Sequence, residues 1–169
     1  SIIAGFWGRR LGDKISLYMS SSLLLISMTL SWITFWQLSS NHVDKVYPLM
    51  EWMNVGDCSI VWSLRHDMLS AVMMIVITTV SAMVHIYSIG YMSHDNSKPR
   101  FMSYLSLFTF AMLMLVTSDN LIQLFFGWEG VGLASYLLIG FWYHKPSAHT
   151  AAMKAFIVNR VGDFGFILG

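Results

Sequence analysis

The chain contains a series of apolar stretches, each about as long as a bilayer is thick. Residues 15–38 hold no charged side chain. About 20 apolar residues span the hydrocarbon core as a helix, and a helix is required because lipid offers the backbone no hydrogen-bond partner. Four comparable stretches cover residues 68–92, 101–118, 120–143 and 147–169. We therefore predict an all-α fold, a polytopic transmembrane helix bundle with about five spans.

The composition excludes several other classes of protein. Hydrophobic residues make up 56% of the chain and charged residues only 11%, against about 25% charged in soluble domains. The net charge of +1 comes without a basic run, so nucleic acid is not an expected partner. Cys58 is the single cysteine and lacks partners for a disulfide, a zinc site or an iron–sulfur site. No phosphate loop, HExxH or nucleophile-elbow motif is present, so we expect no metal or cofactor to bind this chain.

Both ends of the sequence are apolar. Residues 1–8 are too few to span a bilayer and are followed by Arg9 and Arg10, and residues 164–169 end without a polar flank. We expect one transmembrane domain over residues 1–169, incomplete at both ends, with a truncated first helix. A naturally split subunit is the alternative.

Basic residues favour one side of the membrane. If residues 1–8 are the first helix, one side receives Arg9, Arg10, Lys14, Lys98, Arg100 and Lys145, and the other receives only Lys45 and Arg65. Because basic loops stay inside, the first set marks the cytoplasm or the mitochondrial matrix. The stretch 39–67 then lies outside, and its alternation of apolar and polar residues suggests a short surface hairpin.

Glu129 interrupts the fourth apolar stretch. It follows Asn120 by nine residues, or about 14 Å along a helix axis, which places it near the bilayer midplane. Glycines surround it at positions 127, 130, 132 and 140, leaving room for a neighbouring backbone or for water. Charged residues inside a membrane are usually functional, so we interpret Glu129 as a proton carrier. A structural carboxyl group that is hydrogen-bonded between helices is the alternative.

The fifth stretch supplies cations for Glu129. Burial favours the protonated form of a carboxyl group and a nearby cation favours the charged form, so a cation that moves can drive proton uptake and release. Lys154 and Arg160 are the candidates, although Lys154 can also extend to the inner interface. Arg160 and Asp163 are three residues apart and can form a self-neutralising pair. His85 in the second stretch is either a proton relay or an interfacial packing residue.

One segment is specific enough to indicate a family. GWEGVGLASYLLIGFWY (127–143) resembles the antiporter-like chain 5 family of NADH:ubiquinone oxidoreductase, respiratory complex I. HIYSIGYM (85–92), the segment 99–125 and AAMKAFIVNRVGDFGFILG (151–169) support the resemblance in the same order. The resemblance implies an antiporter-like fold and a proton-translocating membrane-arm subunit, in which Glu129 corresponds to the key membrane glutamate of the family.

The resemblance also implies the setting of the chain. Lys154, Arg160 and Asp163 fall on the sixth helix of the family, whereas the lysine that partners the glutamate lies on a seventh helix beyond residue 169. The chain would be a subunit of an enzyme without redox catalysis of its own. Flavin and iron–sulfur centres would belong to other subunits, with NADH and ubiquinone as substrates of the complex. Its partners would be other membrane-arm subunits and the lipid bilayer.

The expected location is the mitochondrial inner membrane, crossed several times, with a bacterial inner membrane as the alternative. The rival function is that of a cation/proton antiporter, in which this chain would be part of the large subunit. That subunit shares the fold. A purely structural membrane subunit with an inert Glu129 is a second rival.

The charge bias predicts which loops share a side of the membrane. Single cysteines introduced at Ser97 and at Asn54 should react with an impermeant thiol reagent from opposite sides of sealed vesicles. Ser97→Cys should be labelled from the matrix or cytoplasmic side, because basic loops stay there. Equal labelling of both cysteines from one side would contradict the predicted topology.

Overall fold

The computed structural model describes residues 12–41, 44–55, 58–93, 95 and 97–169. These residues form α2 (Asp13–Asn41), β1 (Lys45–Val55), β2 (Cys58–His66), α3 (Met68–Tyr91), α4 (Lys98–Val116), α5 (Leu121–Ile139) and α6 (Pro146–Leu168). The truncated helix predicted at residues 1–8 lies outside the described residues, as do Arg9, Arg10 and the side chains of Lys14 and Cys58. Each of the five predicted spans coincides with one helix.

The helices confirm the helical bundle. Within the described ranges, α2, α3, α4 and α5 are long and apolar enough to cross a membrane. Helix α6 has 23 residues, but Lys154, Arg160 and Asp163 make it more polar, so its crossing stays a prediction. Helix α4 begins earlier than residue 101 because Pro99 fits the first turn of a helix. Helix α5 ends at Ile139, before the predicted residue 143, with Gly140 as its C-terminal cap.

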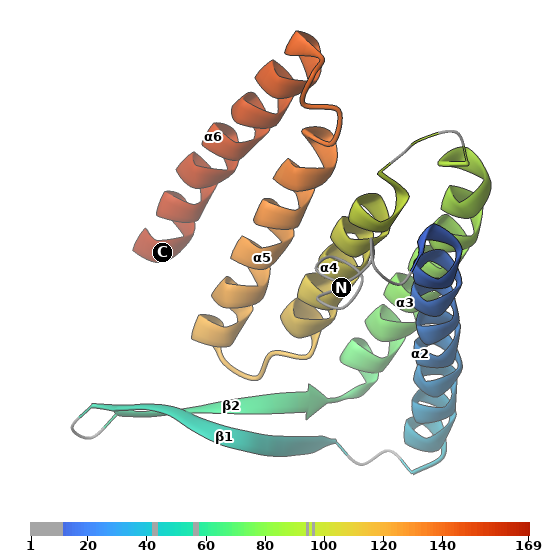
Figure 1. Cartoon of the computed structure of the whole chain (residues 1–169). Coiled ribbons are helices and arrows are strands. Elements are labelled where there is room, and N and C mark those ends of the chain that lie inside the picture. Colours follow the sequence, from blue (N-terminus) through green and yellow to red (C-terminus); the bar gives the residue numbers. More distant parts are fainter. Residues whose placement is uncertain (1–11, 42–43, 56–57, 94, 96) are drawn as a thin grey trace.

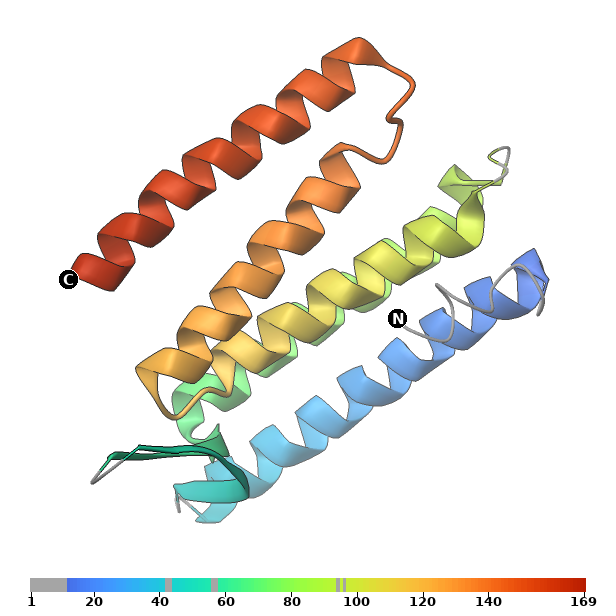
Figure 2. The same ribbon diagram turned by 60° about the vertical axis from the view of Figure 1, so that its left-hand side comes forward.

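The helices lie side by side from α2 and α3 through α4 and α5 to α6 (Figures 1 and 2). Small residues fill the contacts between them: Ala71, Ala82 and Ala134 are buried. Large apolar side chains point outward instead, and Leu69 is 73% exposed. This distribution is typical of membrane helices, which associate through small residues because lipid surrounds their apolar side chains as well as protein does.

Helices α4 and α5 make a close backbone contact at two glycines. A Cβ atom built on Gly127 would lie 2.7 Å from both the Cα and the N of Leu115, and one built on Gly130 would lie 3.1 Å from Cβ of Ala111. Any larger residue at position 127 would therefore collide with the backbone of α4. These glycines position the segment of α5 that carries Glu129.

The predicted hairpin is present and is longer than the sequence suggested. Strands β1 and β2 pair antiparallel from Lys45↔His66 to Val55↔Cys58, with register shifts at Pro48/Met50 and Glu51/Met53. This two-stranded sheet, with an isolated bridge from Leu64 to Ser118, departs from an all-α fold within the described residues. The sequence pattern did not predict the whole of β1, because apolar and polar residues do not alternate along it.

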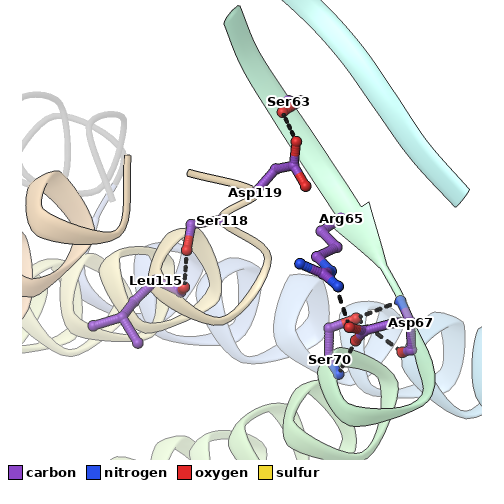
Figure 3. Close-up of polar contacts among 7 residues, drawn as sticks. All are labelled: Ser63, Arg65, Asp67, Ser70, Leu115, Ser118 and Asp119. Atoms are coloured by element: carbon purple, nitrogen blue, oxygen red, sulfur yellow. Dashed lines mark hydrogen bonds and ion pairs between the residues drawn. The ribbon is translucent and has the colours of Figure 1, made fainter. Parts of the chain in front are cut away.

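The hairpin is bonded to the loop between α4 and α5. The backbone N–H of Arg65 donates to the carbonyl oxygen of Thr117 (2.8 Å), and the Ser63 hydroxyl donates to Asp119 (3.1 Å; Figure 3). The Asn120 side chain donates to the carbonyl oxygen of Val61 (3.0 Å). These bonds hold strand β2 against the ends of both helices.

Strand β2 leads directly into the cap of α3. The Asp67 carboxylate accepts the backbone N–H of Ser70 (2.7 Å), and the backbone N–H of Asp67 donates to the Ser70 hydroxyl (3.0 Å; Figure 3). The bond from the Ser70 backbone is the main reason why the pKa of Asp67 lies below its usual value. Arg65 adds an ion pair at 3.0 Å. The hairpin and the start of α3 therefore form one bonded unit.

The loops sort to two ends of the bundle (Figure 1). The hairpin and the α4–α5 loop lie at one end, while the α3–α4 and α5–α6 connections lie at the other. This arrangement agrees with the alternation of loops that the charge bias assumes. Which end faces the matrix or cytoplasm stays a prediction.

The contact at Gly127 predicts a large effect of one methyl group. Gly127→Ala should destabilise the complete subunit by about 1–3 kcal/mol, because overpacking forces the two backbones apart. Gly90→Ala is the matched control, since a Cβ atom there meets nothing within 4 Å and alanine favours helix formation by up to about 1 kcal/mol. The measurement is the amount of subunit that survives graded heating in detergent. Equal loss of both variants would contradict the close contact.

Candidate functional site

Glu129 forms an ion pair with Arg160, across the contact between α5 and α6. Helix α5 begins at Leu121, where the Asn120 side chain accepts the backbone N–H of Gln123 (2.8 Å) and caps the helix. Two helical turns further on, Glu129 projects toward α6, and its side chain is 22% exposed. The cation that the fifth apolar stretch was expected to supply is therefore Arg160.

Asp163 lies on the other side of the same guanidinium. Its Oδ2 atom is 3.6 Å from Nη1 of Arg160, so the predicted Arg160–Asp163 pair is confirmed. The Oδ1 atom accepts the indole N–H of Trp128 at 2.9 Å, and the residue is buried. One guanidinium thus lies between two carboxylates, and this set of Glu129, Arg160 and Asp163 is called the carboxylate cluster below.

The carboxylate cluster borders a pocket of about 230 Å³ between α4, α5 and α6. Its α6 wall consists of Phe156, Asn159, Arg160 and Asp163. Gly132 on α5 opposes the amide of Asn159, which lies 3.7 Å from a Cβ atom built on that glycine. The pocket brings polar groups and space for water next to Glu129.

Sequence reasoning missed several residues of this pocket, including Trp128 as a donor, Ser135, Phe156 and Asn159. A signal was present for α6, because residues 156, 159, 160 and 163 follow the i, i+3, i+4, i+7 spacing of one helix face. Arg160 also lies over the Phe156 ring, 4.7 Å from its centroid. The Arg160–Asp163 pair therefore identified this face of α6, but Phe156 on the same face was not recognised from the sequence.

Lys154 is not brought to the carboxylate cluster. It precedes Arg160 by six residues, or about 9 Å along α6, and its side chain is exposed. Among the residues that the structure describes, it makes no ion pair. Its expected role as a charge partner stays a prediction.

His85 belongs to a second, separate polar site between α3 and α4. It is fully buried, and its Nδ1–H donates to the carbonyl oxygen of Ser81 (2.9 Å). Its Nε2 lies 3.2 Å from the Ser106 hydroxyl. The Ser81 hydroxyl contacts that of Thr109 at 2.5 Å, and Thr109 donates to the carbonyl oxygen of Leu105. A neutral imidazole satisfies this pattern, in which His85 joins the two helices.

The described residues contain no group of three or more histidine, cysteine, aspartate or glutamate side chains arranged to hold a metal ion. The carboxylate cluster places two carboxyl groups and one permanent cation beside the pocket between α4, α5 and α6.

Comparison with known proteins decides the family. A model of the complex I chain 5 N-terminus matches residues 52–102, and a model of the NADH:quinone oxidoreductase/Mrp antiporter transmembrane domain matches residues 118–169. NADH-quinone oxidoreductase subunit L of Rhodobacter capsulatus is 55% identical over all of this chain and 24% of its own length. NADH-ubiquinone oxidoreductase chain 5 of Chondrus crispus is 50% identical over all of this chain and 25% of its own length.

The chain belongs to the complex I chain 5 family. The chain 5 relative from Arabidopsis thaliana is also 50% identical over the whole chain and 25% of its own length. The chain therefore spans about a quarter of the length of these relatives. The residues that the antiporter-type model matches include Glu129, Arg160 and Asp163, and those that the N-terminal model matches include His85.

The bond between Trp128 and Asp163 predicts a difference between two tryptophans. Trp128→Phe keeps a ring but removes the N–H, and a hydrogen bond to a charged group contributes about 1.5–3 kcal/mol. Trp142→Phe is the matched control, because its indole N–H binds the Asp95 carboxylate at an exposed position (3.2 Å). Thermal denaturation of the assembled complex should show a lower midpoint for Trp128→Phe only. Equal midpoints would mean that the partly buried bond between Trp128 and Asp163 contributes nothing.

Proposed function

We propose that this chain is part of a proton-translocating membrane-arm subunit of respiratory complex I, in which Glu129 carries the proton. The complex would couple electron transfer from NADH to ubiquinone to proton pumping across the membrane. Membership of the chain 5 family supports the setting, and the carboxylate cluster supports the role of Glu129.

The observation that carries the proposal is the sharing of one guanidinium by two carboxylates. With both carboxyl groups ionised, the carboxylate cluster would hold one negative charge in excess, and a medium of low dielectric constant disfavours such a charge. Uptake of one proton removes it. Asp163 has a second donor in Trp128, whereas the described contacts of Glu129 include Arg160 alone. Glu129 is therefore the carboxylate that takes the proton.

Protonation would also change the position of Arg160. A neutral Glu129 no longer attracts the guanidinium, so Arg160 can close the distance of 3.6 Å to Asp163. When Arg160 returns, it favours release of the proton from Glu129. The two states of the carboxylate cluster thus correspond to loading and unloading of one proton.

Lys154 and His85 have more distant roles in this proposal. Lys154 can act as a further charge partner if α6 moves along α5. His85 can relay a proton only if one of its bonds to Ser81 or Ser106 breaks, because both ring nitrogens are occupied. Its stronger role is to join α3 to α4.

The remaining partners follow from the proposed complex. NADH, ubiquinone, flavin and iron–sulfur centres would bind to other subunits, and this chain would contact other membrane-arm subunits and lipid. We place it in the mitochondrial inner membrane or in a bacterial inner membrane, as a multi-pass protein. Its helices of membrane-spanning length support this location.

A cation/proton antiporter subunit is the rival function. The model that matches residues 118–169 describes both complex I and Mrp antiporters. The model for residues 52–102 and the relatives reported above name only NADH-quinone or NADH-ubiquinone oxidoreductase. These observations favour complex I.

The test compares two substitutions of Glu129 in the complete subunit. Glu129→Gln keeps the shape but removes the titratable proton, so proton transport per assembled complex should fall at least about tenfold. Glu129→Asp keeps the acid but withdraws it by one methylene, roughly 1.5 Å, and should reduce transport less. Transport is measured in vesicles and normalised to the complex seen on a native gel.

Glu51→Gln is the matched control, because it makes the same change at an exposed position of β1 and should leave transport unchanged. A structural role for Glu129 predicts the opposite order, since glutamine fills the site and aspartate leaves a gap. Normal transport by Glu129→Gln would refute the proposed function.

A further inference from the structure

Two pairs of aromatic rings lie along the contact between α5 and α6, one on each side of the carboxylate cluster. Tyr136 and Phe156 form one pair, with ring centroids 5.4 Å apart. Phe125 and Phe166 form the other, stacked at 5.7 Å. Helices α5 and α6 run in opposite directions (Figure 2). Residues 125, 129 and 136 of α5 therefore pair with residues 166, 160 and 156 of α6, and one ring pair lies on each side of Glu129 and Arg160.

A second pocket, of about 160 Å³, lies beyond the Tyr136–Phe156 pair. It is at the end of the bundle that the charge bias predicts to face inside, and it is called the inner pocket below. Tyr136 lines the inner pocket, while Phe156 lines the pocket of the carboxylate cluster. The ring pair therefore forms the boundary between the two pockets.

The inner pocket contains residues with polar side chains. Its lining includes Arg100, Tyr104, Tyr136 and His149. The Arg100 guanidinium donates to the carbonyl oxygen of Phe141 (3.2 Å), but its buried Nε has no hydrogen-bond partner among the described residues. An unsatisfied buried donor favours the presence of water.

We propose that protons reach Glu129 from the predicted inner side through the inner pocket, with the Tyr136–Phe156 pair as the barrier. The inference rests on the proposed function. Two rings in contact exclude a continuous chain of water, as apolar constrictions do in channels. When the rings separate, water connects the two pockets and a proton passes along it to the Glu129 carboxylate, which becomes the neutral acid.

The Phe125–Phe166 pair closes the opposite side of the carboxylate cluster. With both pairs in contact, Glu129 is reached from neither end of the α5–α6 contact. Opening of one pair at a time would give the carboxylate access to one side of the membrane at a time. The inner pair is the one that adjoins a pocket with an unsatisfied buried donor, Nε of Arg100, so it is assigned to proton entry.

The barrier is tested by the accessibility of a thiol placed behind it. Ser135 lines the pocket of the carboxylate cluster, so Ser135→Cys is introduced into the complete subunit within its assembled complex, together with Cys58→Ser. Inverted vesicles expose the inner side to impermeant 2-sulfonatoethyl methanethiosulfonate. Mass spectrometry of the peptide that contains position 135 then gives the labelling rate.

Phe156→Ala should raise this labelling rate at least about tenfold, because it removes one ring of the barrier. Tyr136→Phe keeps both rings and Phe166→Ala alters only the outer pair, so both should label at the original rate. Phe156→Leu preserves most of the apolar volume and should still raise the rate about threefold, which provides the test if the alanine variant does not assemble.

The outcomes separate the two proposals. If Phe156→Ala and Phe156→Leu label at the original rate, the barrier is wrong, whatever the result for Glu129→Gln. If Phe166→Ala raises the rate from the inner side as much as Phe156→Ala, the assignment of the inner pair is wrong. If labelling rises as expected but Glu129→Gln transports protons normally, the barrier stands and the proposed function fails.

Discussion

Arg160 takes part both in the contact between α5 and α6 and in the carboxylate cluster. A charged side chain inside a membrane needs a partner within the protein, and Arg160 finds two, Glu129 on α5 and Asp163 on its own helix. The first contact joins α5 to α6, the helix that carries Lys154, Arg160 and Asp163. The second makes the charge balance uneven, since two carboxylates share one cation. The same contact that joins α6 to α5 therefore also forms the site at which we propose that a proton binds.

The close packing of α4 and α5 serves this site. Glycine at positions 127 and 130 allows α5 to approach Leu115 and Ala111, which brings the backbone around Glu129 close to α4. Such contacts depend on shape and not on a hydrophobic driving force, because lipid and protein are equally apolar. The glycines beside the glutamate are thus best explained by helix contact, while Gly132 faces the amide of Asn159.

The sequence was sufficient for the helices and for the residues of the carboxylate cluster. Apolar length located each helix to within a few residues, and the three-residue spacing of Arg160 and Asp163 predicted their pair. The sequence offered Lys154 and Arg160 as cations near Glu129, and the resemblance implied a further lysine on a seventh helix. It did not decide between Lys154 and Arg160, because the rotation of α6 against α5 depends on side-chain packing. For the same reason the sequence did not reveal Phe156 beside Arg160, or Ser106 and Thr109 beside His85. These are contacts between helices, and hydropathy describes each helix alone.

The hairpin affects how the bundle can move. It ties together the ends of α3, α4 and α5 on one side through Asp67, Thr117 and Asp119, and Trp62 adds a ring contact to Phe126 on α5 (5.3 Å). The far end of α5 is held more lightly, by the bond from the Arg100 guanidinium to the carbonyl oxygen of Phe141 and by ring contacts. The hairpin therefore fixes the ends of α3, α4 and α5 as one block, and a movement of α5 that separated the inner rings would pivot about that block.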